Sequence, residues 1–362
     1  MNDSLSTQTI VTISFFRKGL PVWYSRRTRI AVSTLALLGL AIICNTPTVM
    51  AAENAEVAEN AGAAENAEAA EGAAKISGPR AIGPIPTQGP ISADELGFDE
   101  IVFVKRKPYS SDHYYTDINN GTSPDRFLPE NGIYVYNVRT GEERAVVTAA
   151  DLPGGKGFLG KLSLSFDAQK VLFDFRQDPG SGFRIWEVGI DGSGLRQVSS
   201  PPADEPEKVA RWHPSWHTDD IHPCYLPDGH VIFSSTRSEH TVLCGGSSHL
   251  VAPTLHRMTA DGKDVVQLSN SPVSEFCPVI LSDGRVMYHR WEYVDKGARV
   301  GKTFWAMNPD GTGQTAYFGN MHGGIAMLDA KPIPGTKKIV SAFSLGHGRP
   351  EHLGHVSIVD PS

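Results

Sequence analysis

Two stretches of the chain decide its fold: His222-Pro-Cys-Tyr-Leu-Pro-Asp-Gly-His-Val-Ile-Phe233 and Cys277-Pro-Val-Ile-Leu-Ser-Asp-Gly-Arg-Val-Met-Tyr288. In each, an apolar run leads to an Asp-Gly pair and then to a second apolar run, which is the pattern of a β-hairpin. A second Asp-Gly phrase follows each of them, as in Leu255–Leu268 and Phe304–Tyr317. Two hairpins in succession predict a four-stranded antiparallel sheet for each repeat.

Weaker copies of these phrases extend the repeat over most of the chain. They are Ile101–Val104 with Gly132–Val138, Leu162–Phe173 with Arg184–Val198, and Ala330–Val340 with His355–Asp360. Repeats of about 40 to 60 residues with four strands are typical of sheets that stand radially around a channel. The sequence therefore predicts an all-β fold, a β-propeller of about five recognisable four-stranded blades over residues 95–362. Because the last repeat stops within a unit, we expect a five-bladed closure, a missing C-terminal region, or a protein partner that completes the ring.

The first 52 residues have the composition of an export signal or a membrane anchor. An apolar run, Ile30–Cys44, follows Arg26, Arg27 and Arg29 and precedes Val49-Met-Ala51. A basic flank, an apolar run of about 15 residues and a small-residue site are typical of a cleaved signal peptide. The alternative is an anchor that is not removed, because neighbouring residues lengthen the run. Both predict an exported protein, periplasmic or attached to the cell envelope, that meets the membrane only through this segment.

Residues 53–94 are predicted to form a disordered tether, rich first in Ala, Glu and Asn and then in Pro and Gly. This stretch has too few large apolar side chains to offset the entropy of ordering. Its glutamates contribute much of the net charge of −7. Since the chain has neither a basic patch nor interleaved aromatic residues, we do not expect it to bind nucleic acid.

One group of candidate ligands follows from the repeats themselves. Alignment on the Asp-Gly turns sets His222 opposite Cys277 and, less directly, opposite Lys161 and Asp329. The first strand of each propeller blade lines the central channel, so equivalent positions converge there. An imidazole, a thiolate and a carboxylate would suit zinc or another transition metal. The alternative is that these side chains fill the channel and form hydrogen bonds with one another or with water.

A second group lies in the segment Arg211-Trp-His-Pro-Ser-Trp-His-Thr-Asp-Asp-Ile-His-Pro-Cys224, which contains His213 and His217. Loops at blade ends are where propellers bind other molecules. Strand alternation predicts that His222 and Cys224 lie on one face. The spacing matches no zinc-finger pattern, so a hydrogen-bonded loop with a Cys224–Cys244 disulfide is the alternative.

Several kinds of chemistry lack their motifs in this chain. No Cys-x-x-Cys-His segment occurs, so there is no c-type haem attachment motif. The Gly-x-Ser-x-Gly nucleophile elbow and a glycine-rich phosphate loop between a strand and a helix are also absent.

Some of these phrases resemble known families. The segments Val188–Val198 and Met307–Gly313 resemble TolB-like propeller repeats. The segments Asp219–Gly229, Phe233–Arg237 and Tyr288–Gly297 are similar to the propeller part of proteins like the alpha subunit of hydrazine synthase. Both resemblances imply a propeller and say little about function.

The second resemblance also implies expectations about a site. In that family the propeller is joined to haem-binding segments, and a propeller cysteine takes part in a haem site beside zinc. We expect Cys224 to be the counterpart of that cysteine and therefore a cofactor-binding residue. The chain departs from the family because it has no haem motif, so the resemblance does not imply hydrazine synthesis.

The sequence thus predicts an exported binding or scaffold module without catalysis of its own. The alternative is a metal- or haem-dependent enzyme, or its propeller subunit, with a site at the channel mouth around His222, Cys224 and Cys277. Propeller lyases that act on acidic sugars use such a histidine-rich metal site. A detached propeller of a prolyl-oligopeptidase-like hydrolase is a third interpretation.

Overall fold

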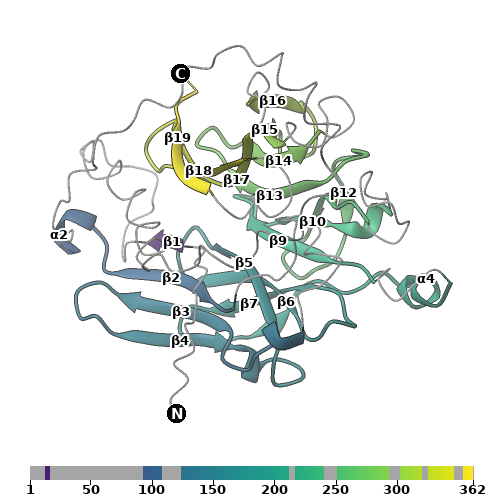
Figure 1. The fold of residues 1–362 in the computed structure, drawn as a ribbon, viewed down its shortest axis with the longest axis horizontal. Helices are drawn as coiled ribbons and strands as arrows, with labels where there is room; N and C mark the ends of the chain where they lie inside the picture. The colour runs from purple at the N-terminus through teal and green to yellow at the C-terminus, as the bar shows by residue number, and fades with distance from the viewer. Residues whose placement is uncertain are drawn as a thin grey trace, which may run out of the picture.

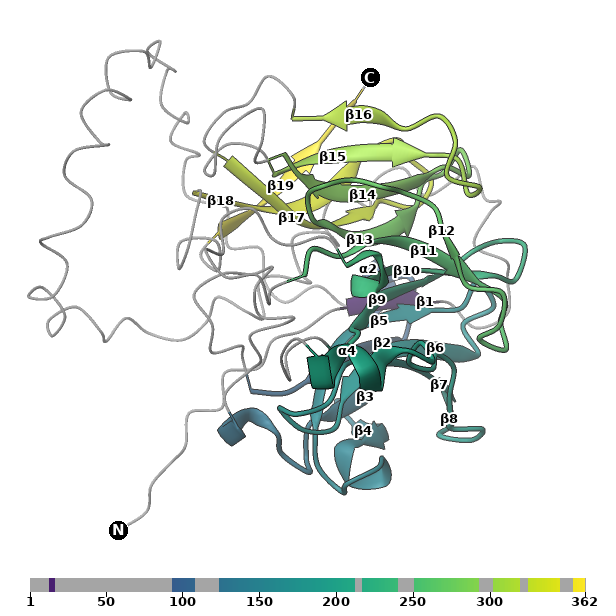
Figure 2. The same cartoon turned by 90° about the vertical axis from the view of Figure 1, so that its right-hand side faces the viewer.

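The computed structural model describes most of the repeat region and one short upstream segment (Figure 1). The described residues are 13–16, 93–107, 124–211, 217–239, 251–292, 302–319, 325–345 and 354–361. Within them, antiparallel sheets follow one another around a common centre. Figure 2 shows the same sheets from the side, stacked from the blue N-terminal blade to the yellow C-terminal blade. The predicted all-β architecture is confirmed.

Three blades contain four consecutive strands each in the predicted order, and a parallel pairing at Lys302 and Ala326 joins blade 4 to blade 5 in one seven-stranded sheet. Blade 2 consists of β5 (Phe158–Leu164), β6 (Lys170–Arg176), β7 (Arg184–Gly189) and β8 (Arg196–Gln197). Blade 3 consists of β9 (Asp220–Tyr225), β10 (Val231–Ser235), β11 (Thr254–Met258) and β12 (Val266–Gln267). Blade 4 consists of β13 (Glu275–Ile280), β14 (Val286–Trp291), β15 (Lys302–Met307) and β16 (Thr315–Phe318).

The blades at the two ends of the series differ from this pattern. Blade 1 combines β2 (Glu100–Lys105), β3 (Gly132–Asn137) and β4 (Glu143–Thr148) with β1 (Ile13–Phe16). Blade 5 has three strands among the described residues: β17 (Ile325–Pro332), β18 (Ile339–Leu345) and β19 (Gly354–Val359). The sequence analysis did not foresee β1, which lies inside the segment assigned to a signal or an anchor.

The few helical elements are short. They are α2 (Ala93–Leu96), α4 (Glu205–Arg211) and the 3-10 turns η1 (Pro124–Arg126), η2 (Ala149–Asp151) and η4 (Thr236–Ser238). Within the part of the chain that the structure describes, no helix is long and apolar enough to span a membrane. The apolar run Ile30–Cys44 and nearly all of the predicted tether lie outside that part.

Apolar side chains hold each blade against the next. Phe173 is fully buried in a cluster that joins blades 1 and 2, Phe233 in one that joins blades 2 and 3, and Tyr288 in one that joins blades 3 and 4. Burying an aromatic or aliphatic side chain of this size contributes about 1.5 to 3 kcal/mol. The core is therefore a series of interfaces between sheets, and each blade depends on its neighbours.

The Asp-Gly turns of the second hairpins pack closely against the preceding blade. Gly192, Gly262 and Gly311 have φ angles of +87°, +82° and +87°, which favour glycine. A Cβ on Gly262 would lie 1.8 Å from the carbonyl oxygen of Val198, and one on Gly311 would lie 2.7 Å from that of Leu268. In each case the obstructing carbonyl belongs to the preceding blade. The second hairpin therefore needs glycine both for its turn and for close packing between blades.

Candidate functional site

The inner strands of blades 3, 4 and 5 share an irregularity at equivalent positions. Their pairing with the next strand shifts at His222, Cys277 and Asp329. These residues have φ angles of 53°, 51° and 52°, a left-handed conformation that is uncommon for residues other than glycine. Each is therefore the first residue of a β-bulge, which redirects side chains out of the normal alternation. Backbone strain of this kind is concentrated at functional sites.

The equivalent position in blade 2 is Gly160, because the pairing of β5 with β6 shifts between Leu159 and Leu162. The prediction that Lys161 aligns with His222 is therefore wrong by one residue. A Cβ at Gly160 would lie 1.8 Å from Asp174 Oδ1, so the carboxyl group of Asp174 occupies the space that a side chain would need.

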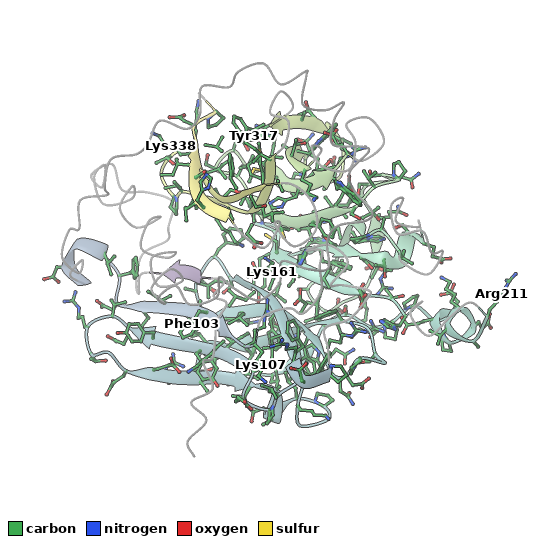
Figure 3. All side chains as sticks on the ribbon, in the orientation of Figure 1. Phe103, Lys107, Lys161, Arg211, Tyr317 and Lys338 are labelled. Atoms are coloured by element: carbon green, nitrogen blue, oxygen red, sulfur yellow. The ribbon has the colours of Figure 1, made fainter. Side chains whose placement is uncertain are left out.

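The bulges bring side chains of four blades into contact near the centre around which the blades are arranged, where Figure 3 labels Lys161. Cys277 Sγ lies 3.6 Å from His222 Nδ1 and 3.6 Å from Asp329 Oδ1. Lys161 forms an ion pair with the same carboxylate oxygen of Asp329. The structure thus joins the three aligned residues and Lys161 in one set of contacts, which we call the axial cluster.

Hydrogen bonds from the preceding blade cap the amides of the bulges in blades 3 to 5. Asp174 Oδ2 accepts from His222 N at 2.7 Å, and its other oxygen accepts from Lys161 N within blade 2. His222 Nδ1 accepts from Cys277 N at 3.3 Å. His289 Nε2 accepts from Ala330 N at 3.2 Å. Because buried N–H groups need acceptors, these caps allow the bulges to exist in the interior.

The protonation states agree with these roles. Burial, reinforced by the Lys161 ammonium, holds the pKa of His222 well below its ordinary value. Burial also lowers the pKa of His289 to about 4. Both imidazoles are therefore neutral near pH 7, and a neutral imidazole has the free nitrogen that accepts a hydrogen bond.

The pKa values of the two carboxyl groups of the site are shifted in opposite directions. Burial raises the pKa of Asp174 to about 6, despite the two backbone amides that it binds. Burial opposes ionisation of Asp329 too, but the Lys161 ammonium outweighs it and holds the pKa of Asp329 below its ordinary value. Asp329 keeps 44% of its side chain exposed, whereas Lys161 keeps 12%. The axial cluster therefore combines a partly exposed ion pair with a thiol and a neutral imidazole.

The metal prediction for His222, Cys277 and Asp329 is not tested by this geometry. The Lys161 ammonium pairs with one carboxylate oxygen of Asp329. No group of three or more His, Cys, Asp or Glu side chains is arranged to hold a metal ion among the residues that the structure describes. A metal at this position stays a prediction.

Cys224 follows the bulge at His222 and Pro223 and packs among apolar side chains such as Leu226 and Ile232. That His222 and Cys224 lie on one face stays a prediction. Cys224 is a buried free thiol, so it does not form the alternative disulfide, and burial raises its pKa. Its proposed cofactor role is not tested, and Cys244 lies outside the described residues.

The histidine-rich segment before β9 agrees with the hydrogen-bonded alternative where it is described. His217 is buried, with Nε2 3.3 Å from Arg176 Nη2 and 3.9 Å from Asp219 Oδ1. Asp219 Oδ1 accepts from Phe183 N at 2.9 Å, and burial raises the pKa of this carboxyl group. His213 lies outside the described residues, so its predicted metal role is untested.

Sequence reasoning missed Asp174 and His289, the two side chains that cap neighbouring bulges. Asp174 gives a signal, because it is a charged residue inside the otherwise apolar Val171–Phe175. His289 directly follows the apolar run of its hairpin and gives none. Their partners lie in the next blade, which no local pattern reveals.

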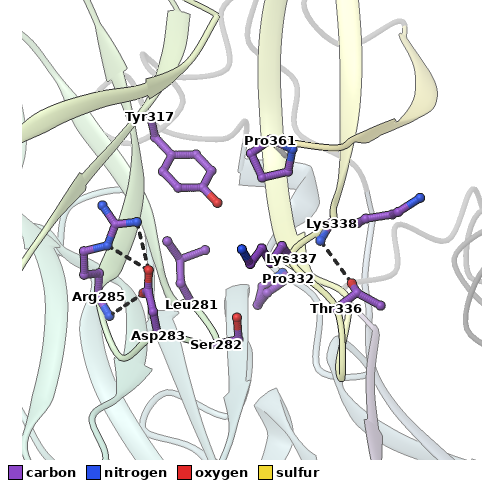
Figure 4. Close-up of a pocket in the computed structure, with 10 residues that line it drawn as sticks. All are labelled: Leu281, Ser282, Asp283, Arg285, Tyr317, Pro332, Thr336, Lys337, Lys338 and Pro361. Carbon is purple, nitrogen blue, oxygen red and sulfur yellow. Dashed lines mark hydrogen bonds and ion pairs between the residues drawn. The ribbon is translucent and has the colours of Figure 1, made fainter. Parts of the chain in front are cut away.

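A pocket of about 250 Å³ lies apart from the axial cluster, between the β13–β14 turn and the β17–β18 turn (Figure 4). Its lining includes Tyr317, Lys337 and Arg285, whose guanidinium group pairs with Asp283 at 2.8 Å. None of the predicted site residues contributes to this pocket.

A buried carboxyl group next to the site predicts a dependence of stability on pH. Glu275 is 0% exposed, Ser269 donates to one of its oxygens, and burial raises its pKa to about 7. Because the folded pKa lies above the ordinary 4.5, this group favours folding below pH 4.5 and loses that contribution as pH rises to 7. The loss is about 3 kcal/mol, at about 1.4 kcal/mol for each pKa unit.

The variant Glu275→Gln should remove that part of the pH dependence. We expect urea unfolding at pH 4.5 and pH 8 to give a smaller difference for the variant than for the wild type. Asp283→Asn, at an exposed carboxylate, is the matched control and should leave the difference unchanged. Equal differences for Glu275→Gln and the wild type would contradict the assignment.

Comparison with known proteins reveals relatives by structure. No family model matches the sequence, and no curated protein matches it either. A chain of hydrazine synthase from Kuenenia stuttgartiensis superimposes with a TM-score of 0.53 and 19% identity over 75% of this chain. The fold is a β-propeller. The match covers 38% of the hydrazine synthase chain, so the likeness concerns the propeller and not the whole protein.

More distant propellers show weaker likeness. A putative TolB from Agrobacterium tumefaciens matches with a TM-score of 0.40 and 15% identity, over 62% of each chain. An oligogalacturonate lyase from Vibrio parahaemolyticus matches with a TM-score of 0.42 and 11% identity, over 73% of this chain and 63% of its own. The resemblance to the propeller of the hydrazine synthase kind is confirmed at the level of fold by the first of these matches.

Proposed function

We propose that this chain is the propeller module of an exported protein and that it binds a polar ligand or partner at its axial cluster without catalysing a reaction alone. The fold supports a β-propeller module. Export is supported by the basic and apolar N-terminal segment, which has the composition of a signal or an anchor. The ligand class is a small zwitterionic or charged group, because the open part of the cluster is an ion pair.

The contacts of Cys277 and His222 carry the proposal. His222 Nδ1 already accepts the backbone N–H of Cys277, so the nitrogen nearest the thiol is engaged as a structural acceptor. The Asp329 carboxylate, 3.6 Å from Sγ, disfavours a second negative charge on the thiol. A nucleophilic cysteine needs the opposite surroundings, with a free base and positive charge beside the sulfur. The cluster is therefore better suited to binding than to nucleophilic catalysis.

One observation favours the metal- or haem-dependent enzyme as the second candidate. The Cys277 thiol lies 3.6 Å from the His222 imidazole and 3.6 Å from the Asp329 carboxylate, and these are the ligand types that zinc and other transition metals prefer. A metal ion would have to displace the Lys161 ammonium from Asp329 and the Cys277 amide from His222. These displacements cost binding energy and make this function the weaker candidate.

Elemental analysis and a visible spectrum of the exported protein, purified without chelator, separate the two functions. We expect metal well below one equivalent per chain and no haem absorption. The variants Cys277→Ala and Cys224→Ala form a matched pair of buried thiols. A stoichiometric metal that is lost in Cys277→Ala and retained in Cys224→Ala would refute the binding module and establish the enzyme.

Titration of the same preparation with zwitterionic and anionic small molecules tests the binding role directly. Lys161→Met removes the ammonium that faces Asp329, and we expect at least a tenfold loss of affinity for a ligand that uses this ion pair. Lys337→Met, in the separate pocket, is the control and should bind as the wild type does.

A further inference from the structure

Blade 1 receives its first strand in a way that differs from the other blades. Strands β6, β10, β14 and β18 each pair on one side with the strand that directly precedes them in the chain. Strand β2 holds the same place in blade 1, but the element directly before it is helix α2. Its partner on that side is β1, drawn in purple in Figure 1, which comes from much further upstream.

The side of β2 that β1 covers needs a strand. Strand β1 runs antiparallel to β2 and pairs Ile13 with Phe103 and Phe16 with Glu100. Strand β2 belongs to the core, since Val102 is 0% exposed and Val104 is 1% exposed. Backbone N–H and C=O groups of a core strand cost free energy when neither water nor protein satisfies them. We call the covered side of β2, Glu100–Lys105, the acceptor edge.

Export and the β1–β2 pairing exclude each other. The apolar run Ile30–Cys44 separates the two strands in the sequence. If it belongs to a signal peptide that is cleaved near Ala51, Ile13–Phe16 is removed with it. If it anchors the protein in the membrane, Ile13–Phe16 and the propeller lie on opposite sides. In both cases the exported propeller has lost the strand that covers the acceptor edge.

We propose that the acceptor edge is a strand-binding site, filled by Ile13–Phe16 before export and by an antiparallel strand of a different polypeptide afterwards. The inference rests on the export in the proposed function. A second copy of this chain cannot be the donor through these residues, because export removes them from every copy. The donor is a strand of at least four residues without proline, since each position must add backbone hydrogen bonds to β2.

The test uses a fluorescent peptide with the sequence of residues 10–18, Ile-Val-Thr-Ile-Ser-Phe-Phe-Arg-Lys. Its binding is measured by anisotropy to the full chain, to the full chain with Phe15→Pro, and to the exported protein. Proline disrupts β1 because it lacks an N–H and is excluded from the interior of sheets. The same peptide with Phe15→Pro is the matched control ligand.

We expect one peptide to bind to each molecule of the Phe15→Pro chain and of the exported protein, and at least tenfold weaker binding to the full chain, whose edge is filled. If Phe15→Pro impairs folding, the added peptide should restore the near-UV circular dichroism, which also demonstrates the site. Failure of the Phe15→Pro chain both to bind the peptide and to respond to it would overturn the proposal.

Mass spectrometry of the exported protein separates this result from the export hypothesis. A mature N-terminus beyond residue 52, or an anchored N-terminus on the other side of the membrane, agrees with export. If residues 13–16 instead stay with the propeller, the export hypothesis fails, while the Phe15→Pro chain still decides whether the edge binds a strand. Suppose that the exported protein lacks residues 13–16 and does not bind the peptide, whereas the Phe15→Pro chain does. This result would overturn the proposal that export leaves the acceptor edge free to bind a strand.

Discussion

Gly262→Ala should lower the free energy of unfolding by about 2 to 5 kcal/mol. A non-glycine residue in the left-handed conformation costs about 1 to 2 kcal/mol, and Gly262 has a φ angle of +82°. Overpacking adds about 1 to 3 kcal/mol, because the new Cβ would lie 1.8 Å from the carbonyl oxygen of Val198 in the preceding blade. The substitution therefore strains both the turn and the interface between blades 2 and 3.

Gly229→Ala is the matched control for the turn alone. Gly229 has a similar φ angle of +85°, but a Cβ there would meet no atom within 4 Å. We expect this variant to lose about 1 to 2 kcal/mol, the conformational part of the cost. Urea unfolding of the two variants measures the difference between them. Equal losses of unfolding free energy in the two variants would mean that contact with the preceding blade does not constrain the turn at Gly262.

Arg237→Met should destabilise the protein by about 3 to 5 kcal/mol, because it leaves a buried charge without its partner. Asp220 is 0% exposed, and Arg237 donates to its two oxygens at 3.1 and 2.7 Å. Ser235 Oγ also donates to this carboxylate, at 2.7 Å. One neutral hydroxyl donor cannot replace a guanidinium group that forms two charged hydrogen bonds.

An exposed ion pair of the same kind provides the comparison. Arg285→Met removes the partner of Asp283, but the two side chains are 36% and 51% exposed, so we expect a loss below about 1 kcal/mol. The double variant Arg237→Met with Asp220→Asn should regain part of the stability, since it removes the uncompensated charge. Chemical denaturation measures all three. If Arg237→Met loses no more unfolding free energy than Arg285→Met, the buried Arg237–Asp220 pair contributes no more to stability than an exposed one.

The repeat pattern was sufficient to predict the fold. The Asp-Gly pairs mark the hairpins, since residues 229, 262, 284 and 311 all have positive φ angles in turns. What the pattern could not supply was a strand from elsewhere, and β1 is such a strand. A strand of four residues upstream of an apolar segment has no local signal that connects it to Glu100–Lys105.

The candidate site was predicted in part. Alignment on the turns found His222 and Cys277, because the turn residues Gly229 and Gly284 follow them at the same spacing. In blade 2 the turn residue Ala168 lies one residue further from the bulge at Gly160, so the same alignment chose Lys161. Roles that depend on the next blade, such as that of Asp174, required the tertiary structure.

The caps on the bulges also give the ring a direction. Each acceptor belongs to the blade that was synthesised just before its donor: Asp174 serves His222, His222 serves Cys277, and His289 serves Ala330. A blade that emerges from the ribosome thus finds its acceptor already folded, and a chain interrupted after any blade still has every cap that its finished blades need. Loss of a blade from the front leaves the next one without its acceptor. Folding that proceeds blade by blade from the N-terminus therefore never leaves one of these buried amides without its acceptor.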